Sequence, residues 1–83
     1  MQKVAIGKIV HFFPKVGVAV VRLQASLNVG DTVEIGGKSQ PFTQSVSSMQ
    51  VNHKAVSAGK SGEEVAIKVS GACKEGDLVY KTS

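Results

Sequence analysis

The sequence is poor in several residue types, and each shortage excludes a class of protein. It has no Trp, two Pro and one Cys, and aromatic residues make up 5% of its 83 residues. One Cys excludes an internal disulfide or a cysteine-rich metal site and is typical of a reducing compartment. No apolar run approaches the ~20 residues of a membrane helix, and Lys3 and Lys8 interrupt the region where a signal peptide would lie. We therefore expect a soluble, cytoplasmic chain with no membrane partner.

Fourteen Val and nine Gly are the prominent residues, and both favour an all-β fold. Val is β-branched and prefers strands, whereas Gly accepts the backbone angles of tight turns. Apolar segments bounded by turn residues predict six strands, at 3–13, 17–23, 32–35, 40–51, 64–69 and 77–82. Alternation places Val4, Ile6, Val10 and Phe12 on one face of the first strand. We expect one domain over residues 1–83, a single closed six-stranded antiparallel Greek-key barrel whose closure hides its strand edges.

The segment 40–51 changes its apolar face partway along. Phe42 and Val46 occupy even positions, whereas Met49 and Val51 occupy odd ones. A strand has a side-chain period of two, so this change requires a bulge or a sharp bend. We place the bend at 47–48, a pair of serines, and interpret it as a barrel corner.

A Gly-Asp pair occurs twice before an outgoing strand, at 30–31 and at 76–77. Gly tolerates a positive φ, and an Asp side chain can bond the backbone of a turn. The repetition predicts one turn geometry used twice.

The tripeptide Gly59-Lys60-Ser61 invites comparison with a nucleotide-binding P-loop. That motif also requires a Gly at position 54, which is Lys54 here, and a following helix, whereas a strand is expected. We therefore predict that this chain alone binds no nucleotide. Gly59 and Gly62 are interpreted as turn glycines.

Catalytic and metal-binding patterns are not found. His11 and His53 are the only histidines, and neither has further ligands at metal-binding spacing. The serines at 45, 47 and 48 lack the strained G-x-S-x-G elbow of a hydrolase, and adjacent carboxylates at 63–64 should point to opposite faces. Cys73 is interpreted as an inert thiol, although Lys74 beside it could lower its pKa. We expect no enzyme activity, cofactor or metal.

Charge and one aromatic pair suggest binding surfaces. The net charge is +4, and nine of the ten basic residues are Lys. This balance permits contact with a polyanion, but it also serves solubility. The candidate basic residues are Lys8, Lys15, Arg22, Lys54, Lys60 and Lys68. In Phe12-Phe13, a regular strand would expose one ring, which could stack a base or seat a partner protein; the alternative is that both rings are buried.

Five segments carry a family resemblance over nearly the whole chain. They are GVAVV (17–21), LNVGDTVEI (27–35), the bent strand at 45–54, AGKSGEEVAI (58–67) and KEGDLV (74–79). In this order they resemble G-T-V-V, I-K-V-G-D-x-V-E-I, T-x-T-G-V-E-x-F-x-K, A-G-x-N-V-G-L and R-G-x-V-L of the barrel domain of translational GTPases such as elongation factor Tu. FTQ (42–44) and Met49 resemble more closely small stand-alone elongation factor-like proteins and the barrel that ends some U32-family proteins. The resemblance implies a translation-factor-like β-barrel domain over 1–83.

The resemblance also implies a ligand, although key positions differ. In elongation factor Tu this barrel helps to hold the 3′ end of aminoacyl-tRNA. Gln50 falls where the family has Glu, Asn52 where it has an aromatic residue, and Lys60 where it often has Arg. The GTPase domain has no counterpart here. A tRNA pocket of the family type is therefore in doubt, while a polar, basic rim could remain.

Together these features predict a non-catalytic binding module with a role in translation elongation and protein biosynthesis. Its basic rim would contact RNA (tRNA or rRNA), the ribosome or a translation-related protein. The alternative is a protein-interaction barrel that docks onto a larger U32-type enzyme through Phe13 and strand edges; an enzyme subunit ranks last. The expected binding residues are Phe13, Lys15, Gln50, His53, Lys54 and Lys60.

Overall fold

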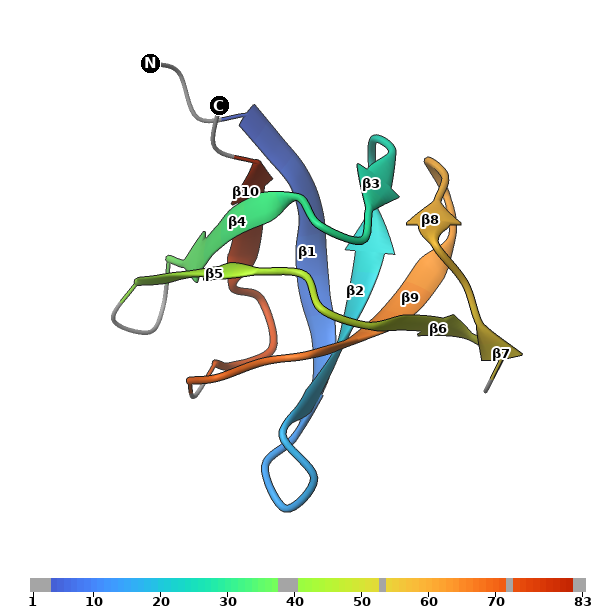
Figure 1. The fold of residues 1–83 in the computed structure, drawn as a ribbon. Coiled ribbons are helices and arrows are strands. Elements are labelled where there is room, and N and C mark those ends of the chain that lie inside the picture. The colour runs from blue at the N-terminus through green and yellow to red at the C-terminus, as the bar shows by residue number, and fades with distance from the viewer. Residues whose placement is uncertain (1–3, 38–40, 53, 72, 82–83) are drawn as a thin grey trace.

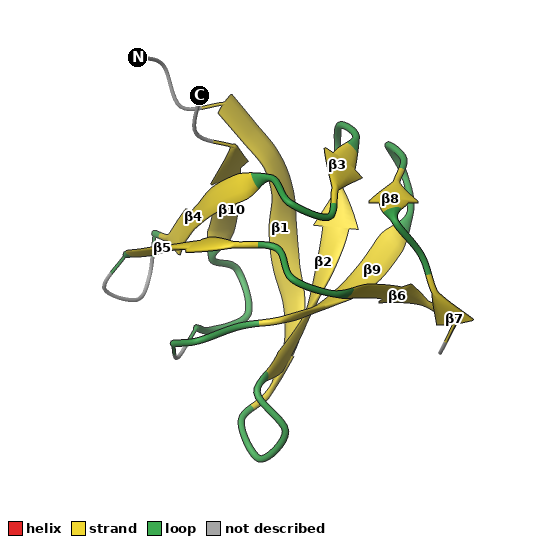
Figure 2. Cartoon of the chain, viewed as in Figure 1, coloured by secondary structure: helices red, strands yellow, loops and turns green. Residues whose placement is uncertain are grey.

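A computed structural model describes residues 4–37, 41–52, 54–71 and 73–81, and this part of the chain contains strands and loops but no helix (Figures 1 and 2). The predicted all-β class is therefore confirmed. The strands are β1 (Val4–Phe13), β2 (Val18–Leu23), β3 (Leu27–Asn28), β4 (Thr32–Gly36), β5 (Phe42–Ser45), β6 (Met49–Val51), β7 (Lys54–Ala55), β8 (Ala58–Gly59), β9 (Glu64–Lys68) and β10 (Leu78–Lys81). The predicted strand ends Lys3, Gln40 and Thr82 lie outside the described residues.

The main sheet is an open half-barrel rather than the closed six-stranded barrel that we expected, so this part of the prediction is wrong. Eight strands follow the order β5-β4-β10-β1-β2-β9-β6-β7, and β3 and β8 form a separate two-stranded ribbon. Two differences explain the result. The segment 40–51 divides into β5 and β6, which lie near opposite ends of the sheet, and the connection after β6 contributes β7 and β8.

The break between β5 and β6 has a specific cause in the hydrogen bonds of Val46. Its N–H donates to the carbonyl of Asp31, and its own carbonyl accepts from the N–H of Gly30, both at 2.8 Å. These bonds tie residue 46 to a turn instead of a neighbouring strand. Val46 and Met49 are each 1% exposed although they are three residues apart. The predicted change of face at 47–48 thus falls within the interruption at 46–48.

The first strand buries a different set of side chains from the one that alternation predicts. Ile6 and Ile9 are 2% and 0% exposed, whereas Val4 is 57% exposed. The pairing register shifts between Ala5 and Gly7, and again between Ile9 and His11. Each shift reverses the face on which the following residues lie. Simple alternation fails here because bulges are decided by the partner strands.

The core between the curved strands is built from aliphatic side chains. Its members are Ile6, Ile9, Ala19, Val21, Leu23, Leu27, Val33, Ile35, Val46, Met49, Val65, Ile67, Val69, Cys73 and Val79. Phe12 and Phe42 pack against its edge.

The turn predicted for the two Gly-Asp pairs is formed at 28–31 and 74–77, and a third copy ends in Glu at 60–63. In each copy the carboxylate of the fourth residue accepts a hydrogen bond from the N–H of the first, at 2.9, 2.9 and 2.8 Å. The fourth residue's N–H donates back to the first carbonyl. The third residue is Gly, with φ of 99°, 95° and 90° respectively, a range that other residues rarely adopt.

Candidate interaction face

Alternation along β2 and β9 creates a partly apolar surface on the outside of the sheet. Ala19 and Val21 of β2 are 0% exposed, so their neighbours Val18 and Val20 point outward. On β9 the buried residues are Val65 and Ile67, which places residues 64, 66 and 68 on the outside. Val18, Val20 and Ala66 are half-buried there.

Strand register aligns these side chains in rows. Phe13 of β1 lies opposite Val18, which in turn lies opposite Lys68. Val20 lies opposite Ala66, which pairs with Gln50 of β6. A third row, flanking the second, joins Lys8, Arg22 and Glu64. We call the surface formed by Phe13, Val18, Val20, Ala66 and Gln50 the outer face.

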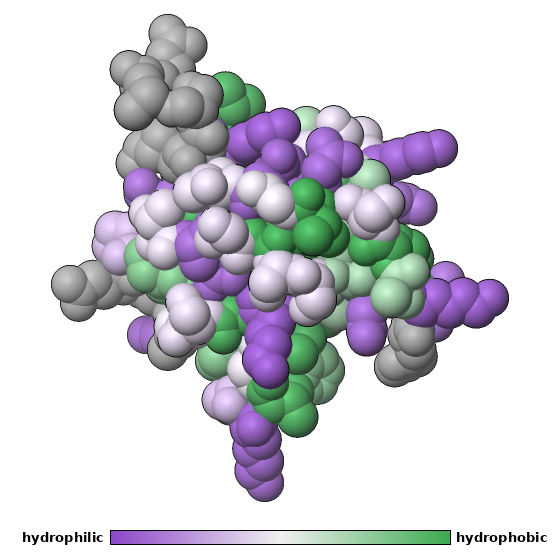
Figure 3. Space-filling view, viewed as in Figure 1, coloured by the Kyte–Doolittle hydropathy of each residue, from purple (hydrophilic) through white to green (hydrophobic). Residues whose placement is uncertain are grey.

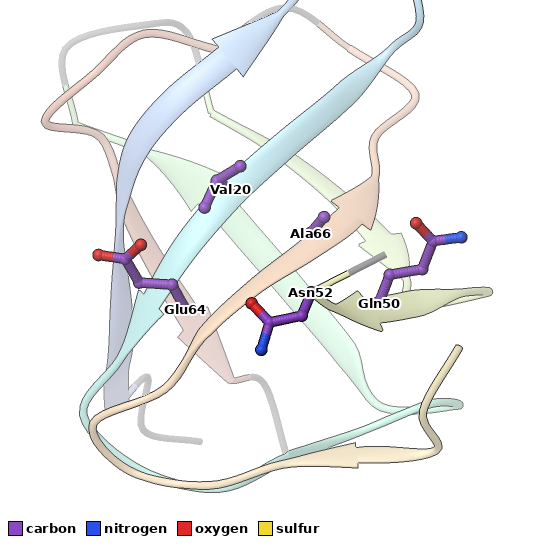
Figure 4. Close-up of a pocket in the computed structure, with 5 residues that line it drawn as sticks. All are labelled: Val20, Gln50, Asn52, Glu64 and Ala66. Carbon is purple, nitrogen blue, oxygen red and sulfur yellow. The ribbon is translucent and has the colours of Figure 1, made fainter. Parts of the chain in front are cut away.

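A shallow pocket of about 240 Å³ lies on the β6 side of the outer face (Figure 4). It is lined by Val20, Gln50, Asn52, Glu64 and Ala66. The small side chain of Ala66 leaves space between its neighbours, while two amides and one carboxylate supply polar groups. Asn52 has a φ of 52°, in the left-handed region that Asn tolerates better than most residues. This arrangement can accept a side chain with an apolar stem and a cationic or amide head.

Gln50 was expected from the sequence as a binding residue, whereas Val20, Glu64 and Ala66 were not. Their alternate positions on two predicted strands were a usable signal. The pairing of β2 with β9 and of β9 with β6, which brings these residues together, cannot be inferred from the sequence.

One ring of the Phe12-Phe13 pair is packed against the core and the other is exposed, which is the first of the two arrangements that we considered. Phe12 packs against the core, whereas Phe13 is 45% exposed. The ring centroids of Phe13 and His11 are 4.3 Å apart, with the ring planes inclined at 56°. Phe13 is therefore an outward-facing aromatic side chain on the outer face.

The lysines expected to make one basic rim are distributed over separate elements. Lys15 is exposed in the β1–β2 loop, Lys54 in β7, and Lys60 in the turn that follows β8. Figure 1 shows these elements projecting in different directions. His53, the remaining member of the predicted set, lies outside the described residues. Lys15, Lys54 and Lys60 therefore belong to three separate parts of the fold.

Among the described residues, the His11–Glu75 pair is exposed, whereas Cys73 is buried. His11 Nδ1 lies 3.3 Å from Glu75 Oε2, with the two side chains 51% and 67% exposed. Burial, and secondly the charge of Asp77, raise the pKa of the Cys73 thiol to about 11. The suggestion that Lys74 lowers this pKa is therefore wrong. Within the described ranges, no three His, Cys, Asp or Glu residues gather as a metal site would require.

Gly59 has a different role from the turn that we predicted. It lies in β8 and is buried, and a Cβ atom added to it would lie 2.7 Å from Leu23 Cδ1 and 2.8 Å from Val65 Cγ1. It is a packing glycine. Gly62, with φ 90°, is the turn glycine.

Ser61, the last residue of the P-loop-like tripeptide, has a structural contact: its Oγ donates a hydrogen bond to the carbonyl of Gln24 at 3.0 Å.

Comparison with known proteins connects the chain to larger protease-type proteins. No family model matches it. It is 44% identical over 80 residues to an uncharacterized protease of Methanocaldococcus jannaschii. The match covers 95% of this chain but 20% of the protease, so the chain spans about a fifth of that relative's length.

Among the described residues, no helix is long and apolar enough to cross a membrane.

Solved structures share the fold. The C-terminal domain of a Geobacillus thermoleovorans protein assigned to the U32 peptidases matches with a TM-score of 0.90 and 22% identity, covering 95% of this chain and 92% of that one. Its selenomethionine variant matches with a TM-score of 0.86 and 22% identity, covering 92% and 96%.

These comparisons contradict the predicted role in translation elongation, protein biosynthesis and RNA binding, because the relatives that carry the likeness are a protease and a U32 peptidase domain. The expected tRNA, rRNA or ribosome partners receive no support from them, and the likeness to elongation factor Tu is not confirmed. Over nearly its whole length, the chain resembles one part of a larger protease-type protein and shares the fold of a U32 peptidase C-terminal domain.

Proposed function

We propose that residues 1–83 form one non-catalytic module of a larger U32-type enzyme, docked against or joined to its main body through the outer face. The observation that carries this proposal is the coverage of the sequence match: 95% of this chain aligns, at 44% identity, with 20% of a longer protease. A module of this size occurs there beside a much larger remainder. Similarity at this level supports a shared role.

The polar groups of the chain suit binding better than bond cleavage. The Cys73 thiol is buried, and its pKa is raised from 9.0 to about 11, which reduces further the small fraction of reactive thiolate at neutral pH. The His11–Glu75 pair is exposed to water. In this proposal the reaction takes place on the larger body, and the module supplies a rigid surface.

The outer face has the composition of a non-obligate interface. Its centre is apolar and half-buried at Val18, Val20 and Ala66, whereas charged residues of both signs lie around it. Apolar centres with polar rims are usual in specific protein interfaces. Gln50 contributes an amide beside the pocket, where a side chain of the body could be held.

Binding to the enzyme body tests the proposal. The body of a U32-type protein from the same source would be prepared without any barrel of its own and titrated with this chain by isothermal titration calorimetry. We expect a saturable, equimolar complex. Ala66→Arg fills the pocket and should weaken binding, whereas Thr43→Arg on the exposed surface of β5 should not. A folded body that shows no binding to the unmodified chain would rule the proposal out.

A further inference from the structure

The β1–β2 hairpin projects from the sheet and exposes apolar side chains at its tip. Phe13 and Val16 are 45% and 63% exposed and lie three residues apart. The other exposed large hydrophobic residues of the described chain are Val4, at the opposite end of β1, and Val29, in the turn after β3. Figure 1 shows the hairpin at the bottom of the view, and hydrophobic surface gathers there in Figure 3.

Backbone hydrogen bonds close the loop of the hairpin and join it to the end of β9. Gly17 N–H donates to the carbonyl of Phe13 at 2.9 Å, and the Gly17 carbonyl accepts from Val69 N–H at 2.8 Å. Gly17 has a φ of 67°, and Pro14 restricts the loop further. The ring of Phe13 lies against that of His11. A tip ordered in this way loses little conformational entropy when it binds.

The charged side chain within the tip and the one paired with its base on β9 are both lysines. Lys15 is the only ionisable side chain in residues 12–18. Lys68 lies opposite Val18 on β9, on the same face as Phe13. The carboxylate of Glu75 lies 3.3 Å from Nδ1 of His11, whose ring lies against that of Phe13. A complementary surface would therefore combine an apolar hollow with acidic residues at its rim.

We propose that this hairpin is the anchor of the module, and that it inserts Phe13 and Val16 into an apolar, acidic-rimmed hollow on the body of the larger enzyme. This inference rests on the proposed function and names the docking element and the chemistry of its partner. An apolar tip with lysines could also meet an anionic lipid surface. The match to part of a longer protein chain favours a protein partner.

The experiment measures binding of the same enzyme body to paired variants of this chain. Phe13→Ser should weaken binding by about 30-fold, the scale of a lost aromatic hot spot, and Val16→Ser should weaken it less. Val29→Ser replaces an exposed valine in the turn after β3 and is expected to have no effect. Lys15→Glu should slow association and reduce its salt dependence, whereas Lys60→Glu in the turn after β8 should not. Unchanged thermal unfolding of each variant confirms that its fold is intact.

The outcomes separate this inference from the proposed function. If the body binds Phe13→Ser, Val16→Ser and Lys15→Glu as tightly as the unmodified chain, the hairpin is not the anchor, although the module still docks. If the unmodified chain does not bind, both proposals fail. Sedimentation with phosphatidylserine vesicles that depends on Phe13 and Val16, without binding to the body, would identify a lipid-binding tip and overturn the protein partner.

Discussion

The side-chain carbonyl of Gln44 accepts a hydrogen bond from the backbone N–H of Ser70 at 2.7 Å. The Gln44 amide nitrogen donates to the carbonyl of Lys68, also at 2.7 Å, and Ser70 Oγ donates to the same Gln44 oxygen at 3.1 Å. One carboxamide thus presents the donor and acceptor that a neighbouring strand would present. It joins β5, at one end of the open sheet, to the segment that leaves β9.

We predict that Gln44→Ala lowers the free energy of unfolding by about 2 kcal/mol, because two backbone hydrogen bonds lose their partner at ~1 kcal/mol each. Urea denaturation provides the measurement. Gln50→Ala, which removes an exposed glutamine from β6, is the matched control. Equal effects of the two substitutions would show that the Gln44 bridge contributes nothing to stability.

Gly59→Ala should destabilise the fold by roughly 1–3 kcal/mol, the cost of overpacking a core. The added methyl group would lie 2.7 Å from Leu23 Cδ1 and 2.8 Å from Val65 Cγ1, in a region that is already filled. Ser57→Ala, on the exposed connection before β8, should change stability by less than about 0.5 kcal/mol. Thermal or chemical unfolding measures both, and a neutral Gly59→Ala would mean that β8 can move away from the core.

Asp77→Ala should cost more stability than Asp31→Ala, although both residues end the same type of turn. Each carboxylate accepts a backbone N–H at 2.9 Å. Asp77 is 0% exposed, whereas the Asp31 side chain is 22% exposed. Removing the buried acceptor leaves a donor that water reaches poorly, at a cost of ~1–3 kcal/mol. Comparable losses in denaturation experiments would indicate that water replaces both carboxylates equally well.

The buried thiol of Cys73 makes stability depend on alkaline pH. Its pKa is raised from 9.0 to about 11 in the folded chain, so folding favours the protonated thiol. This contribution is fully present below pH 9.0 and is lost as the pH rises through about 11. The stability difference between the natural chain and Cys73→Ala should therefore shrink over this interval. A difference that stays constant or grows with pH would contradict the raised pKa.

The reactivity of the same thiol gives an independent check. At neutral pH, alkylation of Cys73 by iodoacetamide should be slow in the folded chain and fast after unfolding, because only the thiolate reacts and the side chain is 4% exposed. Rapid alkylation under native conditions would show that this region opens readily.

Local chemistry was enough to predict several features. Apolar segments bounded by turn residues indicated where β1, β2, β4, β9 and β10 lie, although 40–51 was expected as one strand and forms two. The Gly-Asp pairs indicated a turn that the structure uses at 28–31 and 74–77. The change of apolar parity after Val46 predicted a bend at 47–48, and the structure interrupts the strand there. These features depend on residues close together in the sequence, where backbone preference and side-chain period decide the outcome.

The candidate interaction face was predictable only in part. Phe13 and Gln50 were identified from the sequence, but the pocket floor at Ala66 was not. Lys15 and Lys60, both expected as binding residues, lie on elements that project in different directions. Distances between such residues follow from strand pairing, which sequence separation does not reveal.

The sequence by itself determined an all-β chain, its principal strands and its glycine turns, because these follow from local φ preferences and a period of two. Only the tertiary structure decided that the sheet stays open, that bulges bury Ile9 and expose Val4, and that Gly59 serves packing rather than a turn. Those results depend on which segments meet across the core. Contact between distant segments is set by the packing of the whole chain rather than by any one stretch of it.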